Sequence, residues 1–304
     1  MRRGLGVAVA LLVATAPTYL PSYYVGLLTK GLILGLFAMS LNVILGYTGL
    51  GSFGHALYFG VGAYTAGLLS LKMREGFWVA TVAALAAAAL VALVLGPLTL
   101  RARGSYFGMI TLALAQVAWG IAFGWRSLTG GDDGLPGIAR PVLAGIALSG
   151  ETSFFYLVAV VFGLSALVLA VIVESPFGKT LSGIKESETR MEVLGYHVWG
   201  YQYAACVVAG VFAGLAGVLF VYYNGYVSPV YLSIIVSAQA LLMVILGGAG
   251  TLLGPALGAG IIVLLENLIS VFTERWLLIL GAIYVIVNLV APQGLQGLLR
   301  RRRS

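Results

Sequence analysis

The stretch from residue 31 to residue 71 reads GLILGLFAMSLNVILGYTGLGSFGHALYFGVGAYTAGLLSL and contains no Asp, Glu, Lys or Arg. Residues 193–265 form a second long stretch without any of these four residues. A helix that crosses the hydrocarbon core of a membrane needs about 20 predominantly apolar residues, so each stretch is long enough for more than one crossing. Over the whole chain, 61% of residues are hydrophobic and 9% are charged, whereas about 25% are charged in soluble domains. We therefore predict an all-α, polytopic integral membrane protein.

Hydropathy predicts regular spans and two interrupted regions in a single transmembrane domain, residues 1–304. The regular spans cover residues 4–22, 77–96, 104–125, 153–173, 201–222 and 276–292. The first interrupted region, residues 31–71, breaks at the glycines between Gly46 and Gly54. The second, residues 234–268, breaks at residues 247–250 and again at residues 254–255. At the length that one crossing requires, we expect about ten transmembrane helices, within a range of about 8–10.

The N-terminal segment, the single cysteine and the net charge bear on cleavage of a signal peptide, on disulfides and metal sites, and on nucleic-acid binding. Residues 1–16 resemble a signal peptide, but Pro17 directly after the possible cleavage site argues against cleavage, so we expect a first span or anchor. Cys206 is the only cysteine, which leaves no disulfide within the chain and no cysteine-based metal site. The net charge of +7 is concentrated at the chain ends and in short loops. We interpret it as membrane topology and predict no nucleic-acid partner.

Lys and Arg are more frequent in cytoplasmic loops than in external ones. With ten spans, most of the 17 basic residues fall on the side that holds both chain ends. We therefore expect both termini and a loop at residues 174–200 in the cytoplasm, and a loop at residues 126–152 outside.

The inner loop, residues 174–200, is charged and amphipathic. Its apolar positions are Leu181, Ile184, Met191 and Leu194. Their spacing predicts short helical turns that dock on a cytoplasmic partner. The alternative is a surface helix that only rests on lipid headgroups. Gly178-Lys179-Thr180 resembles the end of a phosphate-binding loop, but Val173 stands where that loop requires glycine. We expect no cofactor in this chain, and any ATP has to be bound by another chain.

Polar groups and glycines inside the spans are the candidates for a solute pathway, because lipid cannot satisfy polar groups and irregular backbone is tolerated only in protein or beside a cavity. The candidates are Asn42, His55, Thr111, Gln116, Gln239, Gly247, Gly248, Gly250, Gly254 and Glu266. His55 is also consistent with a hydrogen-bonded packing role, and no metal site is expected around it. Glu266 either faces the pathway or is solvated near the outer boundary. The glycines either line the pathway or permit close helix packing.

Several blocks of the sequence resemble one permease family. They are GYTGLGSFGHALYFGVGAYTAG (46–67), GSYFGMITLALAQ (104–116), LTGGDDGLPGI (128–138), SPFGKTLSGIKESETRMEVLG (175–195) and VILGGAGTLLGPALGA (244–259). Their order and content are similar to the LivM-type permeases, the membrane subunits of bacterial and archaeal ATP-binding-cassette (ABC) importers for branched-chain amino acids. Gln116 departs from the family pattern, where a carboxylate is frequent, and Met191 replaces a small residue.

The resemblance implies a multi-subunit importer in the cell membrane. This chain would pair with a LivH-type permease, two cytoplasmic ATPase subunits and an extracytoplasmic solute-binding protein. The inner loop would be the segment that couples to the ATPases, through Pro176, Phe177, Gly178, Lys185, Glu186, Glu192, Leu194 and Gly195.

The expected function is half of a translocation pathway for leucine, isoleucine or valine. A urea or short-amide importer is the first alternative, and a secondary transporter or channel without ATPases is the second. We expect no enzymatic activity, because the sequence shows no paired acid and base and no activated nucleophile.

Overall fold

The structure of the chain is a computed structural model. It describes residues 17, 19–102, 104–143, 146–148, 150–272, 278, 279, 281 and 282. The longer helices are α2 (Ser22–Thr48), α3 (Ala56–Lys72), α4 (Phe77–Thr99), α5 (Ser105–Gly124), α7 (Glu151–Glu174), α10 (Val198–Asn224), α11 (Ile234–Gly247) and α12 (Gly254–Phe272). The shorter helices are α6 (Arg126–Thr129), η1 (Gly131–Asp133), α8 (Pro176–Glu186), α9 (Glu188–Val193) and η2 (Pro229–Leu232).

The strands are two residues each, and they lie at the ends of the helices. They are β1 (Leu135–Pro136), β2 (Val142–Leu143), β3 (Ile146–Ala147) and β4 (Tyr226–Val227). β1 pairs antiparallel with β4, and β2 pairs antiparallel with β3. The loop at residues 126–152 is therefore attached to the segment after α10, and the protein remains predominantly helical.

Within the residues that the structure describes, five helices are long and apolar enough to cross a membrane. They are α2, α4, α5, α7 and α10. Four of them confirm predicted spans, and the predicted spans at residues 4–22 and 276–292 lie mostly outside the described residues. The expected number of about ten spans is not confirmed by the part of the chain that the structure describes.

Both predicted breaks are present. α2 ends at Thr48, where Gly49 adopts a left-handed conformation with φ 81° and donates its N–H to the carbonyl of Ile44. Glycine takes this conformation without the steric cost that other residues meet, which is why the helix ends here. α11 and α12 are separated by residues 248–253, in which Gly248 and Gly250 also have positive φ. The further interruption predicted at residues 254–255 is wrong: α12 begins at Gly254, and Pro255 lies in its first turn, where a missing backbone N–H is tolerated.

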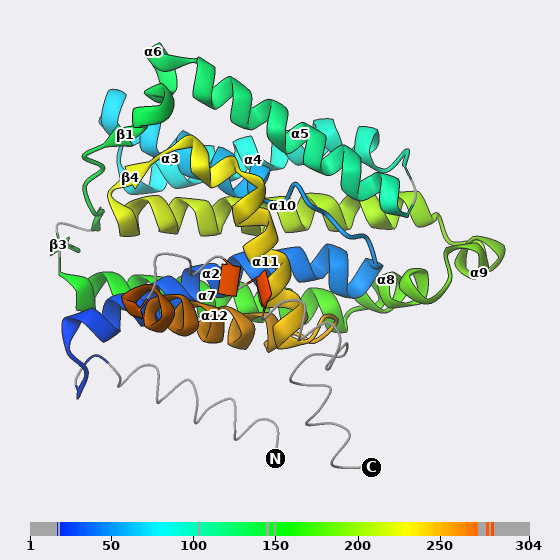
Figure 1. The fold of residues 1–304 in the computed structure, drawn as a ribbon. Helices are drawn as coiled ribbons and strands as arrows, with labels where there is room; N and C mark the ends of the chain where they lie inside the picture. Colours follow the sequence, from blue (N-terminus) through cyan, green and yellow to red (C-terminus); the bar gives the residue numbers. More distant parts are fainter. Residues whose placement is uncertain are drawn as a thin grey trace.

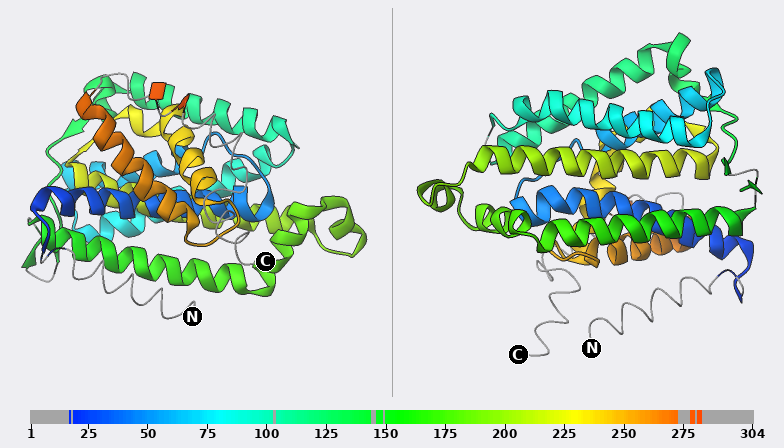
Figure 2. Two further views of the ribbon diagram at one scale, coloured as in Figure 1. Left: turned by 60° about the horizontal axis from the view of Figure 1, so that its bottom comes forward. Right: turned by 180° about the vertical axis from the view of Figure 1, so that it is seen from behind.

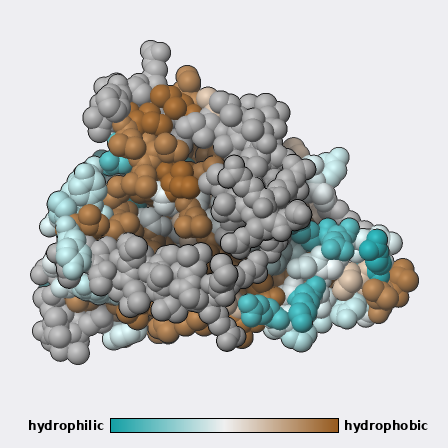
Figure 3. Space-filling model, turned by 90° about the horizontal axis from the view of Figure 1, so that it is seen from below, coloured by the Kyte–Doolittle hydropathy of each residue, from teal (hydrophilic) through white to brown (hydrophobic). Residues whose placement is uncertain are grey.

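The long helices lie side by side, and α11 runs across their direction (Figure 1). α8 and α9 project from one end of the bundle, which we call the α8 end, while α6 and β1 lie at the opposite end, the loop end (Figures 1 and 2). α2 and α10 are largely buried within the bundle, whereas few residues of α7 are buried. From below, apolar residues cover much of the coloured surface and hydrophilic ones gather toward the α8 end (Figure 3).

Small residues allow the central helices to approach each other closely. α4 carries fully buried alanines at four-residue spacing, Ala80, Ala84, Ala88 and Ala92. A Cβ at Gly210 or Gly214 of α10 would collide with this row, and a Cβ at Gly217 would collide with the carbonyl oxygen of Phe59 in α3. Because dispersion between closely packed backbones holds helices together in lipid, these small residues fix the α3, α4 and α10 layer.

We predict that Gly217→Ala destabilises the protein by about 1–3 kcal/mol, because the added methyl group forces α10 away from α3. The matched control is Gly163→Ala in α7, where a Cβ would meet no atom within 4 Å; alanine should there be neutral or stabilising by up to about 1 kcal/mol. Cys206 is buried and is the only cysteine, so a thiol-reactive dye reports unfolding of this chain directly. Equal unfolding temperatures for the two variants would contradict the packing argument.

Candidate functional site

The segment between α7 and α10 forms two short capped helices. Ser175 precedes α8 and its side chain accepts a hydrogen bond from the N–H of Gly178, while Pro176 occupies the first helical position, exposed to solvent. Ser187 caps α9 in the same way, accepting from the N–H of Arg190 at 3.2 Å. Ser at the N-cap and Pro at the first position are the residues that favour a helix start. The predicted short helical turns are thus confirmed.

Two glycines of this segment have structural roles. Gly195 follows α9 with φ 87°, and the N–H groups of Gly195 and Tyr196 bond to the carbonyls of Glu192 and Met191. This is a Schellman ending, which requires a left-handed residue. A Cβ at Gly178 would collide with the carbonyl of Val173 at the end of α7. Gly178 therefore permits the sharp turn from α7 into α8, which explains the glycine without a phosphate loop.

The segment is anchored through its apolar side. Leu181 and Ile184 of α8 are buried in a cluster with residues near the end of α2, and Met191 is partly buried against it. Phe177 stacks on Tyr201 of α10 at 5.7 Å between ring centroids. Apolar burial of this kind is worth about 1.5–3 kcal/mol for each large side chain, so α8 is fastened to the bundle.

The outer side of the segment combines charge with exposed apolar surface. Glu186 and Glu192 are exposed. Val193 is 83% exposed and Leu194 is 65% exposed, and we call these two residues the α9 tip. Leu194, predicted as one of the apolar positions of the segment, is therefore not buried within this chain. Figure 3 shows an apolar patch at the far right, beyond the hydrophilic residues, where α9 projects.

Lys185 is exposed at the surface of α8, and the end of its side chain reaches back to α2. Its Nζ donates a hydrogen bond of 2.7 Å to the carbonyl oxygen of Gly46, in the last turn of α2. The sequence grouped Lys185 with residues that contact an ATPase, but in this structure its ammonium binds another part of the same chain. The carbonyls of a last helical turn lack intrahelical partners, and a lysine ammonium satisfies them well.

Asn42 holds the break between α11 and α12. Its side-chain nitrogen donates to the carbonyl of Thr251, and its side-chain oxygen accepts from the N–H of Gly250, both at 2.9 Å. Asn42 is 2% exposed. This amide replaces the hydrogen bonds that the backbone loses where the helix is interrupted.

His55 and Thr111, two further pathway candidates, also serve the fold. His55 is buried and lies 2.8 Å from the hydroxyl of Ser40 through Nε2, in agreement with the packing interpretation. The hydroxyl of Thr111 donates to the carbonyl of Gly108 and accepts from the N–H of Phe53. These side chains tie the first break to α2 and α5.

The remaining candidates do not gather at one site. Gln116 is exposed on α5, and Gln239 is half-buried on α11. Gly248 is buried at the end of α11. Gly247 and Gly254 face each other so closely that a Cβ on either would collide with the backbone of the other. The close-packing interpretation therefore applies to this glycine pair.

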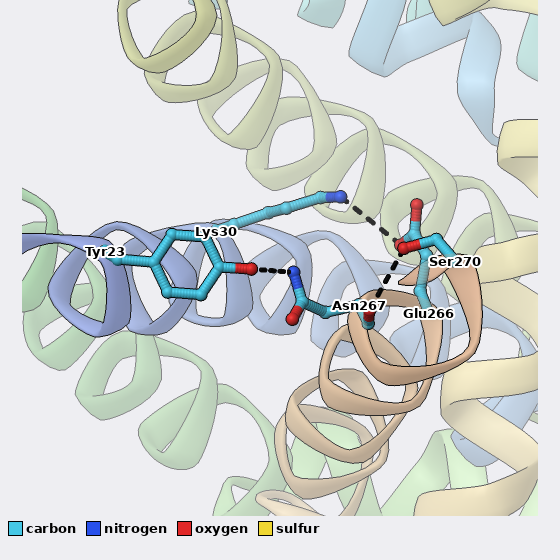
Figure 4. Close-up of polar contacts among 5 residues, drawn as sticks. All are labelled: Tyr23, Lys30, Glu266, Asn267 and Ser270. Atoms are coloured by element: carbon cyan, nitrogen blue, oxygen red, sulfur yellow. Dashed lines mark hydrogen bonds and ion pairs between the residues drawn. The ribbon is translucent and has the colours of Figure 1, made fainter. Parts of the chain in front are cut away.

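Glu266 forms an ion pair that the sequence did not reveal. Lys30 Nζ lies 3.3 Å from Glu266 Oε2, with side-chain exposures of 28% and 21%. Nearby, the amide of Asn267 donates to the hydroxyl of Tyr23, and Ser270 donates to the carbonyl of Asn267 (Figure 4). A cavity of about 170 Å³ lies here between α2 and α12, lined by Leu27, Lys30, Val263, Glu266, Asn267 and Ser270.

The ion pair makes this polar cluster neutral. Glu266 is largely buried, so an unpaired carboxylate would carry a large desolvation cost. Lys30 directly precedes the charge-free stretch, and the Lys/Arg count places it among the external residues, whereas the structure places it within α2, a helix long and apolar enough to cross a membrane. The pair joins α2 to α12 near the loop end.

The chain matches a protein family described as branched-chain amino acid transport system / permease component, over residues 23–288. No solved structure matches the chain.

Three curated relatives carry the name LivM. The high-affinity branched-chain amino acid transport system permease proteins of Escherichia coli and Salmonella typhimurium are each 30% identical to the chain. The alignments cover 95% and 89% of this chain, and 73% and 69% of those proteins, respectively. A probable branched-chain amino acid transport permease of Methanocaldococcus jannaschii is 24% identical, over 85% of this chain and 88% of that protein.

We predict that Lys30→Gln destabilises the chain by about 1–3 kcal/mol, because it leaves the Glu266 carboxylate without its counter-charge; partial exposure keeps the cost below that of a fully buried pair. The double exchange Lys30→Glu with Glu266→Lys restores the opposite charges and should recover most of the loss. The temperature at which a thiol-reactive dye gains access to Cys206 measures the stability of both variants. A double exchange as unstable as Lys30→Gln would show that the ion pair does not hold α2 and α12 together.

Proposed function

Because the chain belongs to the family of branched-chain amino acid transport permeases and is an integral membrane protein, we propose that it is a permease subunit of an ABC importer. It forms half of the translocation pathway for leucine, isoleucine and valine. The observation that carries this proposal is the family match over residues 23–288, and the projecting α8 and α9 segment supports it.

The proposed partners are a LivH-type permease, two ATPase subunits and an extracytoplasmic solute-binding protein, assembled in the cell membrane of a bacterium or archaeon. The α9 tip is the surface proposed to contact an ATPase subunit, together with Glu186 and Glu192. Two large apolar side chains in an exposed, charged segment are costly in water, and a groove on a cytoplasmic protein would cover them. The α8 end and both termini are then cytoplasmic, and residues 126–152 are external.

A channel or secondary transporter is the rival proposal, because it also tolerates broken helices. A protein of that kind has no need for a capped, anchored helix pair that presents an apolar tip away from the bundle. The segment therefore favours a coupled subunit. ATP is bound by the ATPase subunits in this proposal, and this chain acts as a transporter component without catalysis of its own.

The proposed solute agrees with the charges within the spans. Lys30 and Glu266 neutralise each other. The rest of α2 after Lys30, residues 31–48, is uncharged. A neutral pathway suits a net-neutral solute better than an ion, because a free charge in a low-dielectric passage is expensive. An aliphatic zwitterion meets this condition, and so does urea, which is the alternative.

We predict that the complete complex, purified with its permease partner, ATPases and binding protein and reconstituted in liposomes, accumulates labelled leucine, isoleucine and valine. Uptake should require both ATP and the binding protein, because the binding protein delivers the solute and ATP hydrolysis drives its transport. Labelled urea in the same vesicles is the matched solute control. Uptake of urea without uptake of leucine would show that the proposed solute is wrong. Leucine uptake without ATP would show that the protein is not part of an ABC importer.

We predict that Val193→Asp with Leu194→Asp prevents the ATPase subunits from co-purifying with the chain, because two carboxylates would have to be buried in an apolar groove. The control is Met73→Asp, which places a carboxylate at an exposed apolar position after α3, at the loop end. Unchanged co-purification of the double variant would contradict both the docking surface and the cytoplasmic assignment of the α8 end.

A further inference from the structure

One side chain of α8 reaches the place where both helix breaks meet. We propose that Lys185 is a positioning residue, which transmits displacement of α8 to the end of α2 and to the break between α11 and α12. This inference rests on the proposed function, because it requires ATPase subunits that move α8. We call Lys185, Gly46, Asn42 and Gly250 the junction.

The first contact of the junction joins α8 to α2. Lys185 Nζ donates to the Gly46 carbonyl at 2.7 Å. The stem of Lys185 covers Gly49, where a Cβ would lie 3.3 Å from Lys185 Cγ. A charged donor makes a stronger hydrogen bond than a neutral one, and a cation is favoured at the negative end of a helix dipole. The ammonium therefore holds the last turn of α2 to α8.

The second contact joins α2 to the α11–α12 break. A Cβ at Gly46 would collide with both the Asn42 side chain and the backbone nitrogen of Gly250. Asn42 in turn bonds to Gly250 and Thr251. Close-packed groups have no slack into which a neighbour can move, so they pass a displacement on. Movement of the α2 end therefore has to move residues 250 and 251.

The place of Lys185 between the two helix breaks adds to this argument. Gly49, under its stem, begins the first break, while Gly250, at the other side of Gly46, lies in the second. Lys185 thus lies against both interruptions. A second bond of the segment, from Gln202 of α10 to Glu188 at 2.7 Å, leads to an unbroken helix. That bond keeps α9 attached when the Lys185 contact is removed.

The test compares three variants in the reconstituted complex. Lys185→Met keeps the apolar stem and removes the ammonium, Lys185→Arg keeps the charge and its donors, and Lys179→Met removes an exposed charge from the same helix. We expect Lys185→Met to lower the leucine transported per ATP hydrolysed by about tenfold, within the usual range of coupling effects. Lys185→Arg should retain most of it, and Lys179→Met should equal the wild type.

Distances between spin labels then separate coupling from stability. Labels at Leu257 of α12 and Val94 of α4, both exposed, report movement beside the second break. Labels at Ser182 of α8 and Val94 report movement of α8 itself. In the wild type both distances should change when ATP binds. In Lys185→Met the α8 distance should still change, and the α12 distance should not.

Three results would overturn the inference while leaving the proposed function intact. They are normal transport per ATP in Lys185→Met, an ATP-dependent α12 distance that survives this substitution, and an α12 distance that never changes in the wild type. Failure of Lys185→Met to assemble, with normal assembly of Lys185→Arg, would make Lys185 a structural residue and would also overturn the inference. Absence of ATP-driven leucine uptake in the wild type would instead refute the proposed function.

Discussion

A polypeptide inside lipid has to satisfy every backbone N–H and carbonyl from within the protein, and this requirement explains how the two helix breaks are built. Each break receives side chains from other helices. Phe53 N–H is bound by Thr111 of α5, and Ala56 N–H is bound by Ser237 of α11 at 3.0 Å. Asn42 of α2 supplies both a donor and an acceptor to residues 250 and 251. The polar residues of the spans thus replace missing helical hydrogen bonds.

This role changes the meaning of the pathway candidates. A buried Asn, Thr or His in an apolar span is often taken as a ligand for the solute. Here Asn42, His55 and Thr111 each have a partner within the protein. Their hydrogen bonds hold the two segments in which the helices are interrupted. Contact of the three side chains with solute remains a prediction.

The positions of the breaks were predictable from the sequence, but their partners were not. Glycine clusters mark the places where a helix ends, since glycine alone adopts positive φ cheaply. Asn42 bonds to Gly250 across 208 positions of the chain, and no local pattern carries that information. Lys185 shows the same limit: periodicity places it on the polar side of α8, while its partner belongs to a helix that ends well before α8 begins. Lys30 and Glu266 are likewise joined only by the fold.

The exposed α9 tip has a consequence for how such a complex is made in a cell. Val193 and Leu194 are exposed in this chain, and in the proposed assembly an ATPase subunit covers them, so a newly made, unassembled chain would display two large aliphatic groups to water. Chaperones and proteases of the quality-control system recognise surfaces of this chemistry. The tip would then act as a marker of incomplete assembly, which disappears when the subunits are present in the correct ratio. A short apolar projection can in this way link the lifetime of one subunit to the supply of another.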